Sequence, residues 1–156
     1  AVLEVPRARR IVPALQSRLA EARRAGIPVV YVCDAHESDD REFERMGWPR
    51  HAVRGTDGAQ VIAELAPAAG EDIVCKTTYS GFAGTALAQV LERLGVDELI
   101  LTGCVTNICV LYTAADAVMC GYRVRVPADL VADLDEADGQ FALAQMEKVL
   151  GVSVER

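Results

Sequence analysis

The sequence predicts an α/β protein: a three-layer, doubly wound parallel sheet with helices on both faces. Short apolar runs typical of buried strands alternate with segments of helical period along the whole chain. Helices of ten or more residues between strands favour right-handed crossovers and parallel pairing. The 156 residues, 51% of them apolar, suffice for one full core, so we expect a single domain spanning residues 1–156.

The first half of the chain predicts two helices and two strands around a long loop. A helix is expected where apolar residues recur every three or four positions, and it ends where Gly and Pro follow. Residues 34–56 show no sustained period, so we expect a loop, and loops of this length are usually functional. The expected elements are a helix through Ile11, Leu15 and Leu19 that ends at Gly26, a strand over 28–33, a helix over 59–66 and a strand over 72–76.

The second half of the chain continues the alternation. Three helices and three strands are expected, and the carboxyl ends of the strands carry polar residues. Ligands of such sheets bind beyond the carboxyl ends of the strands, so we expect the site there. The expected elements are a helix through Leu87, Leu91 and Leu94, a strand over 98–101, a helix over 107–120, a strand over 122–126, a helix over 136–150 and a strand over 152–154.

The composition indicates a small-molecule partner. A net charge of −7 and a pI near 4.8 argue against nucleic-acid binding, which needs Lys and Arg gathered on one face. No apolar run approaches the roughly 20 residues that span a bilayer, and the N-terminal stretch lacks the apolar centre of a signal peptide. We therefore expect no membrane contact and a cytoplasmic protein.

Cys109 is the first candidate for chemistry among the five cysteines. The odd count and the lack of a Cys-x-x-Cys pair argue against a disulfide framework, so most of these thiols are expected to be small buried hydrophobes. Cys109 differs because it follows a strand and a Gly103 turn and lies at the start of a helix. Unpaired N–H groups there favour thiolate over thiol. Amides between Gly103 and Cys109 could also form an oxyanion hole, or simply an ordinary turn.

Polar residues at two other strand ends are the remaining candidates. Lys76, one of two lysines, ends a strand and could orient a carbonyl substrate or favour a nearby thiolate; alternatively it reaches solvent. Asp34, His36 and His51, with Glu44 between them, suit Zn²⁺, Fe²⁺ or Mn²⁺, although a solvated acidic loop is the alternative. Trp48 could form a wall for a flat ligand or anchor the loop.

Five motifs follow one another along the chain, at residues 34–36, 48–51, 55–58, 76–85 and 103–110. Together they resemble the isochorismatase-like cysteine hydrolases, and within them the nicotinamidases. The resemblance implies that Cys109 attacks a carboxamide carbon, expels ammonia and leaves a thioester for water to hydrolyse. Lys76 matches the catalytic lysine, and a cis peptide after Cys104 would turn the Val105 and Cys109 amides into an oxyanion hole.

The resemblance also implies a metal and a ring pocket. Asp34, His36 and His51 match the metal ligands, and Glu44 lies where some nicotinamidases have a further carboxylate ligand. The metal, Zn, Fe or Mn, would hold the pyridine nitrogen of the substrate. Trp48, Tyr79 and Phe82 would contact the substrate, a small-molecule amide, and we expect a homo-oligomer.

One departure from the family concerns the catalytic acid. The family opens with a central strand ending in the Asp that takes the thiol proton, whereas Ala1–Pro6 resembles the segment after that strand. If the position of this central strand in the sheet were empty, two rows of backbone N–H and C=O groups would be unpaired in the core. We therefore expect roughly 15–25 residues upstream of Ala1, enough for one strand and a loop. The alternatives to a nicotinamidase are a cysteine amidase for another small carboxamide or carbamoyl compound and a catalytically silent family member.

Overall fold

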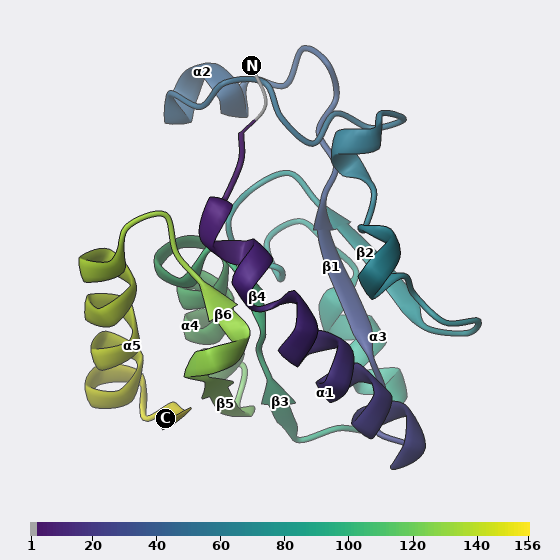
Figure 1. The fold of residues 1–156 in the computed structure, drawn as a ribbon, viewed down its shortest axis with the longest axis vertical. Coiled ribbons are helices and arrows are strands. Elements are labelled where there is room, and N and C mark those ends of the chain that lie inside the picture. Colours follow the sequence, from purple (N-terminus) through teal and green to yellow (C-terminus); the bar gives the residue numbers. More distant parts are fainter. Residues whose placement is uncertain (1–2) are drawn as a thin grey trace.

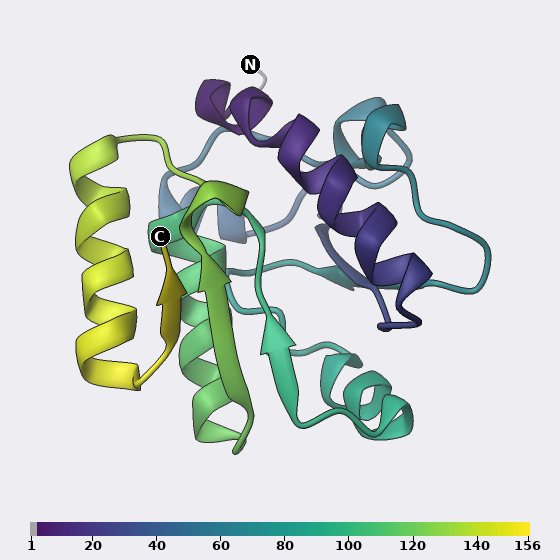
Figure 2. The same ribbon diagram turned by 60° about the horizontal axis from the view of Figure 1, so that its bottom comes forward.

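The computed structural model describes residues 3–156 and has the expected α/β architecture. All of its strand pairs are parallel (Figures 1 and 2). The strands form three hydrogen-bonded groups, one of two strands, one of three strands and one of two short strands. Within each group neighbouring strands pair in this order: β1 (Val30–Asp34) with β2 (Asp72–Lys76); β3 (Glu98–Ile100) with β5 (Arg123–Pro127) and β7 (Ser153–Glu155); and β4 (Gly103–Cys104) with β6 (Val131–Ala132).

Helices cover both faces of the strands, as predicted. α4 (Leu111–Met119) and α5 (Glu136–Leu150) pack on β5, where Ala114, Val126 and Met146 are fully buried. α3 (Leu87–Leu94) packs on β1 and β2. α1 (Val12–Arg24) lies on the opposite side of the strands from α4 (Figure 1). These three layers confirm the predicted fold class.

The structure differs from the predicted elements around the site. The expected helix over 59–66 is two short 3₁₀ turns, Asp57–Ala59 and Ala63–Leu65, because so few residues between a glycine and a proline cannot sustain an α-helix. The expected loop contains a short helix, α2 (Glu42–Met46). Thr106–Val110 is a π-helical turn that leads into α4, and such turns are frequent at functional sites.

A gap separates β1 from β3. The two strands are not paired with each other, and a cavity of about 570 Å³ lies between them. Its apolar lining comes from both strands and from the helices on both faces, including Val32, Leu99, Leu91 and Ala22.

The structure describes no membrane-spanning helix in residues 3–156. Each helix in this range is either too short or too polar to cross a bilayer.

Candidate active site

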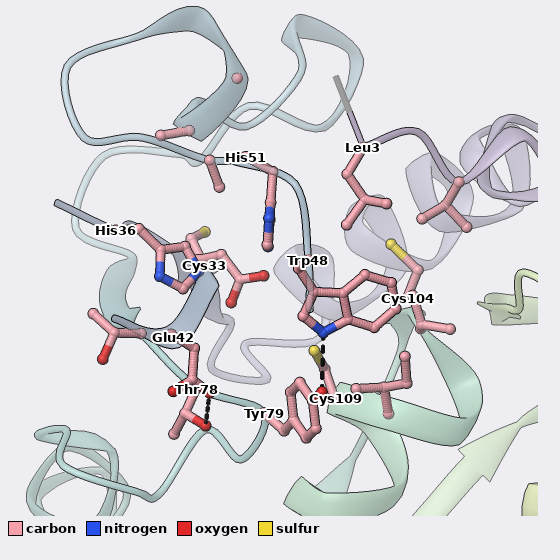
Figure 3. A pocket seen from close by; sticks show the side chains of 18 of the residues that line it. Leu3, Cys33, His36, Glu42, Trp48, His51, Thr78, Tyr79, Cys104 and Cys109 are labelled. Atoms are coloured by element: carbon pink, nitrogen blue, oxygen red, sulfur yellow. Dashed lines mark hydrogen bonds between the residues drawn. The ribbon is translucent and has the colours of Figure 1, made fainter. Parts of the chain in front are cut away.

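The candidate site is a pocket of about 320 Å³ beyond the carboxyl ends of β1 and β2. The loop over residues 35–61 and the segment 77–79 form one side, and the π-helical turn before α4 forms the other. In Figure 3 His36 and His51 lie on the first side, Cys104 and Cys109 on the second, and Trp48 and Tyr79 between them. The chain therefore brings its sequence-distant candidates to the edge where the fold predicts a site.

Cys109 lies in the π-helical turn and contacts an ammonium group. The Lys76 Nζ donates a hydrogen bond to its Sγ at 3.4 Å. A cis peptide joins Cys104 to Val105, at the position that the resemblance implies, and Val105 lines the pocket together with Cys109. Partial burial raises the pKa of Cys33, another thiol in the pocket, and the nearby Cys75 and Asp34 raise it further. The contact with the Lys76 ammonium distinguishes Cys109 from the other pocket thiols and makes it the candidate nucleophile.

Lys76 is a buried cation held by three partners. Its side chain is 5% exposed, forms an ion pair with Asp34 and donates to the Thr78 carbonyl oxygen at 2.8 Å. Burial by itself lowers the pKa of this ammonium, but the Asp34 carboxylate and the Cys109 sulfur outweigh it, and the pKa is raised. Lys76 therefore remains protonated at neutral pH and provides a fixed positive charge beside Cys109.

Three side chains form a candidate metal site. Donor atoms of Asp34, His36 and His51 lie within 4.8 Å of one another. The Nδ1 of His51 bonds to the Pro49 carbonyl oxygen at 2.7 Å, and that of His36, which is 3% exposed, bonds to Asp40 at 2.9 Å. Because these oxygens accept, each ring carries its proton on Nδ1 and leaves the Nε2 lone pair for a metal.

The backbone holds the two histidines together. His36 and Val53 form an isolated bridge in which the His36 N–H donates to the Ala52 oxygen at 2.9 Å and Arg54 donates back to His36 at 2.8 Å. Ala52 has a φ of 43°, in the left-handed region that residues other than glycine seldom adopt. Two hydrogen bonds thus hold a strained residue directly after His51, which fixes this histidine opposite His36.

Two residues predicted for the site lie outside it. Glu44 is exposed and absent from the metal cluster, because α2 directs it to solvent and turns Glu42 inward. Phe82 packs in the core near Tyr122 instead of lining the pocket. Glu42 is the residue that sequence reasoning missed: it is 8% exposed, lines the pocket and accepts from the Thr78 hydroxyl at 2.8 Å. The only sequence signal was its place two residues after Asp40, whose carboxylate accepts from the Glu42 N–H.

An aromatic wall completes the pocket. The Trp48 indole N–H donates to the Tyr79 hydroxyl at 2.9 Å (Figure 3). Tyr79 in turn stacks on Tyr112 of α4, with ring centroids 5.7 Å apart. Trp48 and Tyr79 both line the pocket, so a flat ligand that enters it meets a rigid aromatic surface.

Comparisons with known proteins find a matching family and similar enzymes. The isochorismatase domain family matches residues 1–155. A nicotinamidase/pyrazinamidase of Mycobacterium tuberculosis is 38% identical over 117 residues, which are 69% of this chain and 61% of that protein.

Two solved structures share the fold over nearly the whole chain. A pyrazinamidase of Pyrococcus horikoshii in complex with zinc superposes with a TM-score of 0.92 at 31% identity and covers 99% of this chain and 89% of its own. An N-carbamoylsarcosine amidase of Thermoplasma acidophilum gives a TM-score of 0.88 at 39% identity, with 99% and 86% covered.

Proposed function

The chain belongs to the isochorismatase family, and from this premise we propose that it is an amidohydrolase that converts nicotinamide to nicotinate and ammonia. The observation that carries the proposal is the hydrogen bond from the Lys76 ammonium to Cys109 in a pocket that also holds Asp34, His36 and His51. A cysteine beside a fixed cation is suited to nucleophilic catalysis, and two of the similar proteins are named as amidases.

In the proposed reaction Cys109 forms a covalent intermediate. Its thiolate adds to the carboxamide carbon, and the carbonyl oxygen becomes an oxyanion that the Val105 and Cys109 amides stabilise. The intermediate collapses with protonation of the nitrogen and departure of ammonia, which leaves a thioester on Cys109. Water then adds to the thioester and releases nicotinate and the free thiol.

Lys76 supplies charge in this scheme and does not act as the base. Its raised pKa keeps it protonated, so it stabilises the thiolate and cannot accept the thiol proton at neutral pH. The thiol proton passes to another acceptor, and it balances the proton that the departing nitrogen takes up. The described residues therefore supply the nucleophile and its cation.

The three donors fit a divalent transition metal. Two imidazoles whose Nδ1 atoms bond to oxygens, together with one carboxylate, form a set suited to Zn²⁺, Fe²⁺ or Mn²⁺. Asp34, His36 and His51 would hold the ion, and a bound metal would supply a Lewis acid for the ring nitrogen of the substrate. A zinc complex of a similar pyrazinamidase supports this assignment.

The pocket wall supports a heteroaromatic substrate. Trp48 and Tyr79 form a rigid aromatic surface between the metal donors and Cys109 in the same pocket. A pyridine carboxamide would stack on this wall while its amide reaches Cys109. The similar N-carbamoylsarcosine amidase favours the alternative, a cysteine amidase for another small carboxamide or carbamoyl compound.

Ammonia release from a panel of amides tests the proposal. The panel holds nicotinamide, pyrazinamide and N-carbamoylsarcosine, with and without a chelator. We expect the highest kcat/KM for nicotinamide, its loss in Cys109→Ala, and wild-type activity in Cys120→Ala, which removes an exposed thiol outside the pocket. A preference for N-carbamoylsarcosine would select the alternative, and turnover that survives Cys109→Ala would remove the nucleophile. Absence of turnover with every amide of the panel would favour a catalytically silent member of the family.

Metal analysis tests the donor set separately. We expect about one transition-metal ion per chain, lost in His51→Ala together with activity. Glu44→Gln is the matched control, because the structure places Glu44 in solvent, and it should keep the metal. Full metal content in His51→Ala would contradict the assignment.

A further inference from the structure

One face formed by α4 and the π-helical turn before it makes three contacts with residues 76–81, which are the last residue of β2 and the segment after it. Residues 109, 113 and 116 are spaced i, i+4 and i+7, so they lie along the same side of the helix. Each accepts a hydrogen bond from residues 76–81. The contacts are Lys76 Nζ to Cys109 Sγ at 3.4 Å, Gly81 N–H to Thr113 Oγ1 at 2.9 Å, and Ser80 Oγ to Asp116 Oδ2 at 2.5 Å.

The two contacts farther from the pocket are buried and tightly packed. Ser80 is 7% exposed and Thr113 is 8% exposed. A Cβ on Gly81 would lie 3.0 Å from a methyl group of Val32 and 3.1 Å from one of Leu87, so nothing larger than glycine fits without movement. The segment at Gly81 is therefore fixed between α4, β1 and α3.

The same segment carries groups of the candidate active site. The carbonyl oxygen of Thr78 accepts from Lys76 Nζ at 2.8 Å, and Tyr79 forms part of the aromatic wall. Ser80 follows these two residues directly, so a shift at Ser80 moves the acceptor that fixes the Lys76 ammonium. The contacts on α4 thus set where Lys76 lies relative to Cys109.

We propose that Asp116 and Thr113 are positioning residues for the Cys109–Lys76 pair, acting through residues 78–81. The proposal rests on the proposed function of Cys109 as the nucleophile. Asp116 lies about 10 Å along the helix from Cys109, since each residue adds about 1.5 Å. Its side chain does not touch the reacting atoms. It fixes the register between the helix and the segment, and a misplacement of about 1 Å can lower a rate by about 10²-fold.

The test compares Asp116→Ala with Asp116→Asn. The alanine removes the acceptor of the Ser80 hydroxyl, whereas the asparagine keeps an oxygen at that place. We expect Asp116→Ala to lose at least tenfold in kcat for nicotinamide with a KM within about threefold of wild type, and Asp116→Asn to retain more than half of the activity. Met119→Ala is the control, because this side chain on the same helix is 78% exposed and should change nothing.

A second measurement needs no turnover. The rate at which iodoacetamide alkylates Cys109 at pH 7, followed by peptide mass spectrometry, should fall about tenfold or more in Asp116→Ala and stay within twofold of wild type in the other two variants. This rate decides the proposal even if no amide is hydrolysed, in which case the proposed function fails by itself.

An Asp116→Ala protein that folds and keeps wild-type kcat and alkylation rate would overturn the proposal. A lower melting temperature with both rates unchanged would assign Asp116 a structural role only and would also overturn it. If Asp116→Ala does not fold, Thr113→Val takes its place: it keeps the side-chain shape, removes the acceptor of the Gly81 N–H and carries the same expectations.

Discussion

Replacing Lys76 with methionine should abolish most of the reactivity of Cys109. Methionine fills nearly the same volume at this buried position, so the core around β2 is retained while the ammonium is lost. Asp34, the partner left behind, is 31% exposed and can be solvated. The variant therefore removes the charge without leaving a fully buried, unpaired carboxylate.

The size of the effect follows from the distance between Lys76 Nζ and Cys109 Sγ. Two unit charges 3.4 Å apart interact by about 5 kcal/mol at an effective dielectric constant of about 20. Asp34 offsets part of this attraction because its negative charge lies beside the same ammonium. Since about 1.36 kcal/mol corresponds to a factor of ten in rate, we expect a loss of about 10³-fold in kcat/KM.

Ammonia release from nicotinamide and alkylation of Cys109 by iodoacetamide at pH 7 measure this loss independently. Lys148→Met is the matched control, because Lys148 is the only other lysine and is exposed on α5. It should behave as wild type in both assays. A folded Lys76→Met protein that kept more than a tenth of both rates would refute the argument that this ammonium stabilises the thiolate.

Three further variants test the pocket wall, an ion pair and the core. Trp48→Phe keeps a ring but loses the hydrogen bond to Tyr79, so we expect KM to rise severalfold with little change in kcat; an unchanged KM would remove Trp48 from the substrate wall. The hydrogen bond from Arg23 lowers the pKa of Glu71 from its ordinary value of 4.5. The charged Glu71 therefore stabilises the fold at pH values above 4.5, and this stabilisation is lost as the pH falls through the lower pKa of the folded state. Between pH 6 and pH 3 the melting temperature of Glu71→Gln should fall less steeply than that of the wild type. Equal slopes for the two proteins would contradict the assignment. Met146→Ala should lower the free energy of unfolding by about 2–5 kcal/mol in urea, because this side chain is fully buried, and a change below 1 kcal/mol would show that the site collapses.

Much of the site could be predicted from motif order, but its geometry could not. Asp34, His36, His51, Lys76 and Cys109 were all named from the sequence, and the fold brings them to one pocket. This prediction was possible because the carboxyl ends of parallel strands meet at the same edge of the sheet. The assignment of Glu44 could not be made correctly, since a single-turn helix decides which of two nearby carboxylates faces inward and the sequence there has no clear period.

The shortest secondary-structure elements could not be predicted, for a related reason. The turns at residues 57–65 and the strand β6 are too short to show a periodic pattern, and long-range contacts decide them. The Trp48–Tyr79 hydrogen bond joins residues 31 positions apart, and the contacts of Thr113 and Asp116 with the segment after β2 span 32 and 36 positions. Spacing along the chain carries no information about such pairs.

The sequence alone determined the class of the fold and the residues able to do chemistry. Alternating strand and helix patterns reflect local periodicity, and a cysteine at the start of a helix after a buried strand is a local feature as well. Only the tertiary structure decided which cation contacts Cys109, which imidazole nitrogens remain free and which side of α4 fixes the segment after Lys76. Those facts depend on side chains brought together from distant segments to within about 3.5 Å, and packing fixes such distances.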